Sequence, residues 1–250
     1  MLKPKLSVIT VVYNDVHHIE RTMRSVFNQT YPNIEYLIID GGSSDGTVDI
    51  IKKYESQITK FITEKDEGIY DAMNKGLALA SGDYVLFMNS GDEMYAPDTV
   101  EQIFASQADA DIYYGETEIY SKSWQRLGQR RHKAPEKFTW KSFKYGMNIC
   151  HQAIYIKRSL VQSYDLKYHL SADIDWIIKA AKQAKHIVNT KQYVAKYLSG
   201  GMSKKRHFQS LKERFQIFSK HYGLIPTVMN HGVIGLRLVF YLVRYGSTND

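Results

Sequence analysis

The sequence predicts an α/β protein, with a Rossmann-like domain over residues 1–203 and a basic, partly amphipathic helical extension over residues 204–250. In the domain, short apolar runs of strand length alternate with segments of helical spacing, which indicates a mainly parallel central sheet with flanking helices. The charge also divides, because residues 1–120 carry 9 Lys and Arg against 20 Asp and Glu, whereas residues 121–250 carry 24 against 6. This division indicates cation binding in the first half and an anionic surface or substrate for the second; alternatively, the halves neutralise each other across an interface.

The first hundred residues contain the clearest pattern. Short runs rich in β-branched and aromatic residues predict buried strands at 6–13, 36–40, 61–63 and 84–88. Apolar residues at helical spacing predict helices at 18–27, 48–54 and 69–80. Beyond residue 110 the pattern loosens, with a strand pair or edge strand at 111–120, strands at 153–156 and 193–197, and helices at 174–184 and 207–222.

Four polar side chains fall at or just after the ends of predicted strands. They are Tyr13, Asp40, Asp66 and Asp92. Strands that alternate with helices form right-handed βαβ units, and such parallel sheets bind ligands outside the carboxyl ends of their strands. We therefore expect these four side chains to surround one crevice.

Composition excludes several other classes of protein. An apolar fraction of 44% is enough to bury a sizeable core, so a disordered chain is not expected. The single cysteine, Cys150, rules out an internal disulfide framework and a thiolate zinc site. The N-terminal apolar run is too short for a secretory leader, and no stretch of roughly 18 apolar residues predicts a membrane-spanning helix. A cytoplasmic location is the default expectation.

Two loops at the predicted crevice have residues suited to nucleotide and metal binding. In the segment 40–47, Asp40 is followed by two glycines that allow close approach of a ligand, although Asp40 is equally typical of a turn. In the segment 89–92, Asp92 is able to hold Mg²⁺ or Mn²⁺ against a diphosphate, because hard cations take oxygen ligands and need only one or two carboxylates. An ordinary Asn-Ser-Gly-Asp turn is the alternative.

Taken together, these segments resemble the GT-A fold glycosyltransferases of family 2, in particular the bacterial branch that builds capsule, exopolysaccharide and O-antigen units. The resemblance is dense over residues 5–100 and covers about 200 residues in all. It rests on the ordered segments Ser-Val-Ile-Thr-Val-Val-Tyr-Asn (7–14), Asp-Gly-Gly-Ser-Ser-Asp-Gly-Thr (40–47), Asp-Glu-Gly-Ile-Tyr-Asp-Ala-Met-Asn-Lys-Gly (66–76), Ser-Gly-Asp-Tyr (81–84), Phe-Met-Asn-Ser-Gly-Asp (87–92), Cys-His-Gln-Ala-Ile-Tyr (150–155), Ser-Ala-Asp-Ile-Asp-Trp (171–176) and Gly-Gly-Met-Ser (200–203).

The resemblance implies a set of residues for the nucleotide and the metal. The nucleotide-binding residues would be Val11, Tyr13, Asp40, Asp66, Asn74 and Asn89. Asp92 matches the last acid of the family's Asp-x-Asp-type motif and would bind Mn²⁺ or Mg²⁺. The sequence departs from the family pattern here, since Asn89 and Gly91 replace acids that usually accompany it.

The resemblance also implies the catalytic chemistry. Asp173 matches the acid that serves as general base in inverting members, with Ala172 in place of the preceding Glu, and Asp173 is also placed to cap the helix that follows. Asp175 and His151 are candidates for contact with the acceptor or a phosphate. For His151 a structural role is the alternative, and zinc ligation is not expected because no second ligand lies at suitable spacing.

The implied activity is that of a hexosyltransferase type of glycosyltransferase. It would move a sugar, with inversion, from a nucleotide-diphosphate donor, expected to be a UDP-sugar, to a hydroxyl of a lipid-linked or polysaccharide acceptor. Two rivals remain. One is a catalytically impaired sugar-nucleotide-binding protein, and the other is a nucleic-acid-binding α/β protein, although crevice acids would repel a phosphate backbone.

The C-terminal extension predicts contact with a membrane surface. Basic residues at 204–206, 212, 214 and 220 precede a largely apolar segment of about twelve residues at 233–244, too short to span a bilayer but long enough to lie in its interface. Each cation near an anionic leaflet adds about 1 kcal/mol of attraction. We expect a protein peripheral to the inner face of the cell membrane; a helix packed on the core or a dimer seam are the alternatives.

Overall fold

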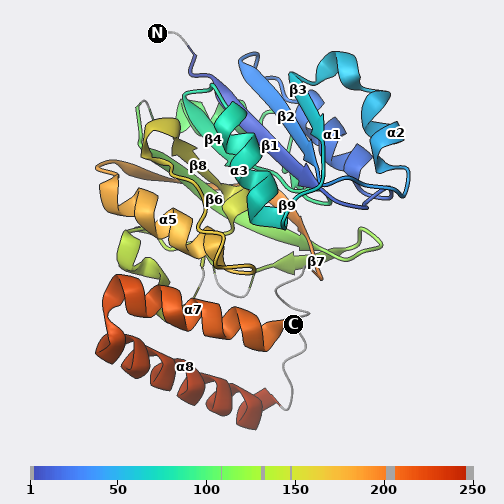
Figure 1. Cartoon of the computed structure of the whole chain (residues 1–250). Coiled ribbons are helices and arrows are strands. Elements are labelled where there is room, and N and C mark those ends of the chain that lie inside the picture. Colours follow the sequence, from blue (N-terminus) through green and yellow to red (C-terminus); the bar gives the residue numbers. More distant parts are fainter. Residues whose placement is uncertain (1–2, 108, 131–132, 147, 201–205, 246–250) are drawn as a thin grey trace.

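The computed structural model describes residues 3–107, 109–130, 133–146, 148–200 and 206–245. A single mixed sheet has helices on both faces, and two further helices lie against one end of this layered body (Figure 1). The strands follow the order β3-β2-β1-β4-β8-β6-β9-β5, with β7 paired to β6. The predicted α/β architecture with flanking helices is confirmed.

Four parallel strands form the first half of the sheet. They are β1 (Leu6–Val12), β2 (Ile34–Asp40), β3 (Lys60–Thr63) and β4 (Tyr84–Phe87). Every residue of β1 and of β4 is buried, as expected of β-branched runs in a parallel sheet covered on both faces. The prediction of parallel βαβ units holds for this half.

The second half of the sheet is mixed. β8 (Ile154–Lys157) runs antiparallel between β4 and β6 (Ile112–Tyr120), and β6 is parallel to β9 (Ile187–Leu198). The short strands β5 (Glu93–Met94) and β7 (Arg126–Gln129) pair antiparallel with β9 and β6. The expected edge strand at 111–120 is therefore internal, since β6 pairs with β7, β8 and β9.

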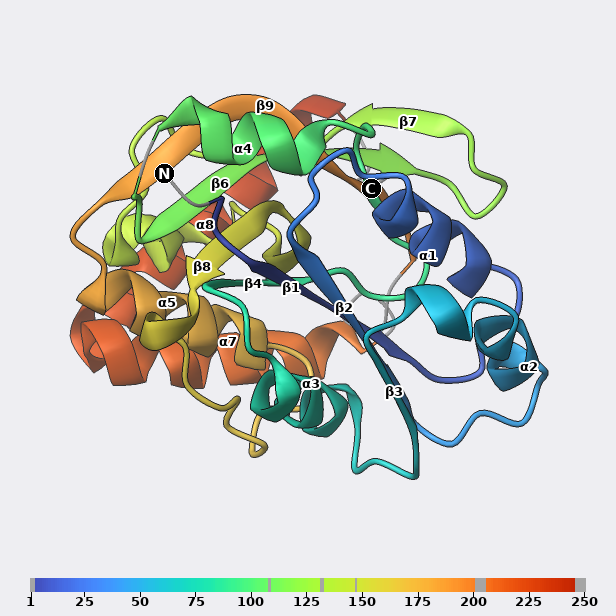
Figure 2. The same cartoon turned by 90° about the horizontal axis from the view of Figure 1, so that it is seen from above.

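Each face of the sheet has its own core. The helices α1 (Ile19–Phe27), α2 (Thr47–Lys52) and α4 (Thr99–Ser106) bury their apolar residues on one face. The helices α3 (Ile69–Leu79) and α5 (Ala172–Gln183) cover the other (Figure 2). The short 3-10 segments are η1 (Glu55–Gln57), η2 (Trp140–Tyr145), η3 (His151–Ala153) and η4 (Arg158–Leu160).

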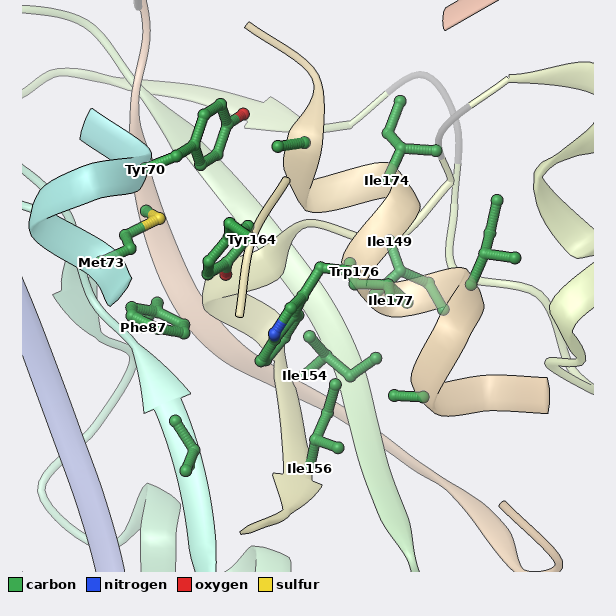
Figure 3. Packing of buried hydrophobic residues seen from close by; sticks show 14 of the residues in the cluster. Tyr70, Met73, Phe87, Ile149, Ile154, Ile156, Tyr164, Ile174, Trp176 and Ile177 are labelled. Carbon is green, nitrogen blue, oxygen red and sulfur yellow. The ribbon is translucent and has the colours of Figure 1, made fainter. Parts of the chain in front are cut away.

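An aromatic stack joins α3 to α5. The rings of Tyr70 and Tyr164 lie 5.2 Å apart between centroids, and those of Tyr164 and Trp176 lie 5.1 Å apart. Figure 3 shows this row, with Phe87 of β4 beside it. Each such pair contributes about 0.5–1.5 kcal/mol beyond its buried area, so the stack fixes the N-terminal turn of α5 relative to α3.

The basic extension forms two helices, α7 (His207–Tyr222) and α8 (Leu224–Tyr245). The second helix begins well before the apolar segment predicted at 233–244. Within the described residues, no helix has the length and apolar character needed to cross a membrane. The predicted boundary between residues 203 and 204, with the Gly-Gly-Met-Ser segment beyond Gly200 and the basic pair at 204–205, lies outside the described residues.

Buried carboxylates attach α7 to the domain. Asp175 of α5 bonds Lys220 and His221 of α7 at 3.0 and 2.7 Å. Glu213 of α7 accepts the backbone N–H groups of His169 and Leu170, just before α5. The extension is thus tied to the segment that carries the predicted general base.

Candidate active site

Three of the four residues predicted to surround one crevice, Tyr13, Asp40 and Asp66, lie at one edge of the sheet, whereas Asp92 lies farther along the chain, directly before β5. Tyr13 follows β1, Asp40 ends β2, Asp66 follows β3, and Asn89 follows β4. Since β3, β2, β1 and β4 are neighbours and parallel, their carboxyl ends meet at this edge. Tyr13 is 64% exposed, which leaves its ring available to a ligand at this edge of the sheet.

Asp40 is fully buried, and one of its two carboxylate oxygens has hydrogen-bond partners among the described residues. Its Oδ2 accepts hydrogen bonds from the backbone N–H groups of Gly42 and Ser43 and from the Thr63 hydroxyl, at 3.0, 2.9 and 2.6 Å. Its Oδ1 is equally buried and has no hydrogen-bond partner among the described residues. A buried acceptor without a partner costs free energy, so this oxygen suits a hydrogen-bond donor brought by a ligand.

Gly41 lets Asp66 approach the end of β2. A Cβ at Gly41 would lie 2.3 Å from Asp66 Oδ2 and 3.4 Å from the Tyr13 ring. The other Asp66 oxygen accepts the Gly68 N–H at 2.9 Å. The structure thus brings Tyr13 and Asp66 together beside Gly41, next to Asp40, where a larger side chain would displace the Asp66 carboxylate.

The loop after β4 is hydrogen-bonded to the segment that follows β1. Ser90 Oγ donates to Asp15 Oδ2 at 2.6 Å, and Asp15 Oδ1 lies 2.5 Å from His18 Nδ1. Asn89 Oδ1 is buried without a hydrogen-bond partner in the part of the chain that the structure describes. A second unsatisfied oxygen therefore lies at the same edge as Asp40 Oδ1.

Asp92 is the last residue of this loop and is buried. Its two oxygens accept from Leu198 N at 2.9 Å and Gln152 Nε2 at 2.6 Å. Burial raises the pKa of Asp92 to about 6, although these hydrogen bonds and nearby His151 act in the opposite direction. The carboxylate is held by neutral donors, so its charge is not compensated by an ion pair.

The donor set suits a hard divalent cation that also binds a diphosphate. The unsatisfied Asn89 oxygen and the Asp92 carboxylate supply oxygen ligands three positions apart in one loop. Such cations keep several waters and use one or two protein ligands together with phosphates. A metal site built from protein side chains alone is not present among the described residues, which contain no group of three or more His, Cys, Asp or Glu suited to hold an ion.

The structure explains why an acid is missing at position 91. Gly91 has φ +95°, which side-chain-bearing residues rarely adopt, and a Cβ there would lie 2.9 Å from the Leu198 side chain. The loop needs glycine to turn beneath β9. The departure from the family pattern is therefore a consequence of the local backbone and of its contact with Leu198.

Asp173 lies in the first turn of α5 with three neighbours. Tyr70 donates to its Oδ1 at 3.2 Å, and the N–H of Ile174 donates to the same oxygen at 3.0 Å. His151 Nδ1 lies 3.4 Å from its Oδ2, and the other ring nitrogen of His151 lies 3.0 Å from Asn89 Nδ2. His151 therefore connects the loop after β4 to the predicted base.

Asp175 requires a correction. It was predicted to contact the acceptor or a phosphate, yet it is 1% exposed and binds Lys179, Lys220 and His221. Burial by itself would raise the pKa of Asp175, but hydrogen bonds from these three groups outweigh it and hold the pKa well below its usual range. Its carboxylate is neutralised on the side of α5 that faces α7.

Two other predicted nucleotide residues present no free polar side chain. Both amide atoms of Asn74 bond the backbone of Tyr164, at 3.1 and 2.7 Å. The Val11 side chain is 5% exposed and packs in the core, while its carbonyl accepts the Ser90 N–H. Their contact with a nucleotide stays a prediction.

Three residues of the site were not singled out from the sequence. They are Asp15, Tyr70 and Gln152, which support Ser90, Asp173 and Asp92 respectively. Tyr70 and Gln152 both fall inside segments that carry the family resemblance. Their place in these segments was the signal that could have identified Tyr70 and Gln152, because residue type alone does not indicate the contact that each side chain makes.

Comparisons with known proteins agree on one class. A family model described as glycosyl transferase family 2 matches residues 7–163. An uncharacterized glycosyltransferase of Mycobacterium tuberculosis is 36% identical over 184 residues, which is 71% of this chain and 69% of that protein. A PGL/p-HBAD biosynthesis glycosyltransferase of Mycobacterium bovis is 28% identical over 253 residues, covering 98% of this chain and 91% of that protein.

Solved structures share the fold at low identity. S. aureus TarS 1–349 in complex with UDP-GlcNAc has a TM-score of 0.65 and 17% identity, covering 96% of this chain and 73% of that one. The mannosyltransferase PcManGT from Pyrobaculum calidifontis, in complex with GDP-Man and Mn²⁺, has a TM-score of 0.65 and 15% identity, covering 94% and 76%. The protein is a glycosyltransferase with the GT-A fold. Within that class, the chain belongs to glycosyl transferase family 2.

Proposed function

We propose that this chain transfers a sugar, with inversion, from a UDP-sugar to a hydroxyl of a lipid-linked or polysaccharide acceptor, in the assembly of a bacterial capsule, exopolysaccharide or O-antigen. The observation that supports a uridine nucleotide most directly is the state of Asp40. Only Oδ1 is free, because Oδ2 already accepts three hydrogen bonds. A single acceptor matches the single N3–H of uracil, and the exposed Tyr13 ring beside it offers a surface for stacking.

Asn89 and Asp92 are the residues that would hold Mn²⁺ or Mg²⁺ near the donor diphosphate. The ion would supply positive charge to the leaving nucleoside diphosphate. Among the described residues Asp92 has only neutral hydrogen-bond partners, so a bound cation would stabilise the ionised carboxylate that burial disfavours. Gln152 and the Leu198 N–H hold the carboxylate in one orientation.

Asp173 is the general base in this proposal. The acceptor oxygen forms a bond to the anomeric carbon as the bond from that carbon to the diphosphate breaks, and the hydroxyl proton passes to the Asp173 carboxylate. General-base help of this kind contributes about 10²–10⁴-fold in rate. Because one displacement occurs without a covalent intermediate, an α-linked donor yields a β-glycoside.

The experiment for the donor uses Asp40→Asn. The amide oxygen would take the three donors that now bond Oδ2, which places an N–H₂ group where uracil N3–H needs an acceptor. We expect the affinity for UDP to fall by about tenfold to a hundredfold, the loss of one hydrogen bond to a charged group. Binding would be followed by thermal stabilisation with UDP, GDP and their sugars in the presence of Mn²⁺. Equal stabilisation of both proteins by UDP would contradict the assignment of the base site.

We also propose that the acceptor is met at the cytoplasmic face of a membrane through α8. The outward face of α8 is apolar: Ile225, Val228, Met229, Leu236 and Phe240 are each more than half exposed. Its inward face carries Thr227 and His231, which pack on α7. Residues 204–249 contain eight Lys and Arg against a single acid, Glu213, which is buried. An apolar face within a basic segment suits an anionic leaflet.

Co-sedimentation with vesicles tests this docking. The variant Ile225→Ser, Met229→Ser, Leu236→Ser should lose binding to vesicles that contain anionic lipid, and the native protein should bind neutral vesicles more weakly. Replacement of Leu127, an equally exposed apolar residue of β7, by Ser is the matched control. Unchanged vesicle binding, or a native protein that is a stable dimer through this face by light scattering, would overturn the membrane assignment.

A further inference from the structure

His151 has both ring nitrogens engaged. It begins η3, between the loop after β4 and the first turn of α5. Nε2 lies 3.0 Å from Asn89 Nδ2, and Nδ1 lies 3.4 Å from Asp173 Oδ2. The side chain of His151 is 15% exposed and that of Asp173 is 12% exposed, so solvent screens these contacts weakly.

The contact with Asn89 determines which nitrogen carries the proton. An amide nitrogen only donates, so His151 Nε2 must accept. In the neutral ring the proton then resides on Nδ1, the nitrogen that faces Asp173. Carboxylates only accept when ionised, so an Nδ1–H group is the form that this pair requires.

We propose that Asn89 and His151 form a positioning pair that orients the Asp173 carboxylate for proton transfer. Tyr70 holds Oδ1 while His151 holds Oδ2, which fixes the plane of the carboxylate. The inference rests on the proposed role of Asp173. It gives the amide at position 89 a purpose that an acid could not fulfil, because a carboxylate there would accept from Nε2 and favour the opposite tautomer.

The contacts of His151 with Asn89 and Asp173 connect the proposed donor site with the proposed acceptor site. Asn89 belongs to the loop assigned to the donor, whereas Asp173 faces the acceptor hydroxyl in the proposed reaction. A single imidazole spans the two, with Nε2 3.0 Å from the Asn89 amide nitrogen and Nδ1 3.4 Å from the Asp173 carboxylate. His151 does not itself serve as the base, because neither ring nitrogen is free to take a proton from an acceptor.

Two substitutions separate the functions of the two ring nitrogens. His151→Asn places an amide nitrogen close to the position of Nδ1 and keeps a donor for Asp173. His151→Gln extends toward the position of Nε2 and loses that donor. We expect kcat to fall by about tenfold to a hundredfold in the Gln variant, part of the 10²–10⁴-fold base contribution, and by no more than about threefold in the Asn variant. The KM for the donor should stay unchanged in both.

Controls separate this effect from loss of fold. His169→Gln replaces an exposed histidine whose side chain has no hydrogen bond to the site. Thermal stabilisation by UDP should be the same in all these variants, which shows that the donor site is intact. Combining His151→Gln with Asp173→Asn should slow the enzyme no further than Asp173→Asn alone, because both changes remove one function.

Nitrogen-15 NMR of labelled histidine reads the tautomer directly. In the neutral ring of the native protein the proton should reside on Nδ1, and in Asn89→Asp it should reside on Nε2. Equal kcat for the Asn and Gln variants, or an Nε2–H tautomer in the native protein, would overturn the inference. If Asp173→Asn leaves kcat unchanged, the proposed base is wrong instead, which is a distinct result.

Discussion

The buried carboxylates at the crevice and those at the attachment of α7 are satisfied in different ways. At the crevice, Asp40 and Asp92 accept hydrogen bonds only from neutral groups, backbone N–H, a hydroxyl and an amide. At the attachment, Asp175 is surrounded by Lys179, Lys220 and His221. The charge of Asp175 is therefore neutralised within the fold, whereas Asp40 and Asp92 have no cation beside them among the described residues. We expect the hydrogen-bond and ionic partners of an acid, more than its burial, to distinguish acids that bind a ligand from structural ones.

The comparison is sharpest between Asp173 and Asp175, two positions apart on α5. Asp173→Asn should lower kcat by about 10²–10⁴-fold, since the amide cannot take the acceptor proton, and should leave UDP affinity unchanged. Asp175→Asn should change kcat by no more than about threefold. Steady-state kinetics with a sugar nucleotide and Mn²⁺ would measure both. A slower Asp175 variant than Asp173 variant would reverse our division of roles.

The second prediction concerns the pH dependence of stability at Asp92. Its folded-state pKa is raised to about 6, chiefly by burial, so the folded protein binds this proton more tightly than the unfolded chain. The contribution of Asp92 to stability is thus greatest below about pH 4 and is lost as pH rises through about 6.

Asp92→Asn removes this pH dependence. In metal-free protein, the unfolding free energy of the variant minus that of the native protein should rise by on the order of 2–3 kcal/mol between pH 4 and pH 7. Urea unfolding at a series of pH values gives this difference. A difference that stays flat would show that Asp92 has a compensating cation.

The smallest effect is expected for the stability of Asp175→Asn. Removing the acid leaves its cations unpaired and should cost about 1–3 kcal/mol at pH 7, less than a fully buried pair because Lys179 and Lys220 are partly exposed. The folded-state pKa is lowered here, so the stabilisation is present above about pH 4 and is lost as pH falls below it. The difference between native and variant proteins in urea should therefore shrink toward pH 3, the opposite trend to Asp92. Asp165→Asn, at a more exposed carboxylate near Lys220, is the control.

The sequence contains enough to predict the crevice but not the partners within it. Strand periodicity places Tyr13, Asp40 and Asp66 at one sheet edge, because in a parallel sheet carboxyl ends coincide. Asp173 and Asp175 look alike in sequence, yet residues two apart on a helix face different directions, and Asp175 contacts Lys220 and His221, which lie 45 and 46 positions away in the chain. Neither periodicity nor residue type indicates such distant partners.

Asn74 illustrates the same limit. It lies in a segment with family resemblance and was predicted to bind the nucleotide, yet its amide bonds the Tyr164 backbone 90 positions away. Gly91 shows the converse case. The absence of an acid at position 91 is visible in the sequence. Its cause is the left-handed backbone of Gly91 and its close contact with Leu198, which belongs to a strand about a hundred residues later in the chain.

The ties between α5 and α7 make the base and the C-terminal helices one rigid piece. His169 and Leu170, which bond Glu213, and Asp175, which bonds α7, flank Asp173 on both sides. Movement of the predicted base toward a substrate would therefore require these contacts to break or the helix pair to move with it. With packed helices roughly 8–10 Å apart between axes, the pair acts as a spacer of fixed height. If α8 lies on a membrane as proposed, we expect the acceptor sugar to be reached when its carrier holds it at that height above the bilayer.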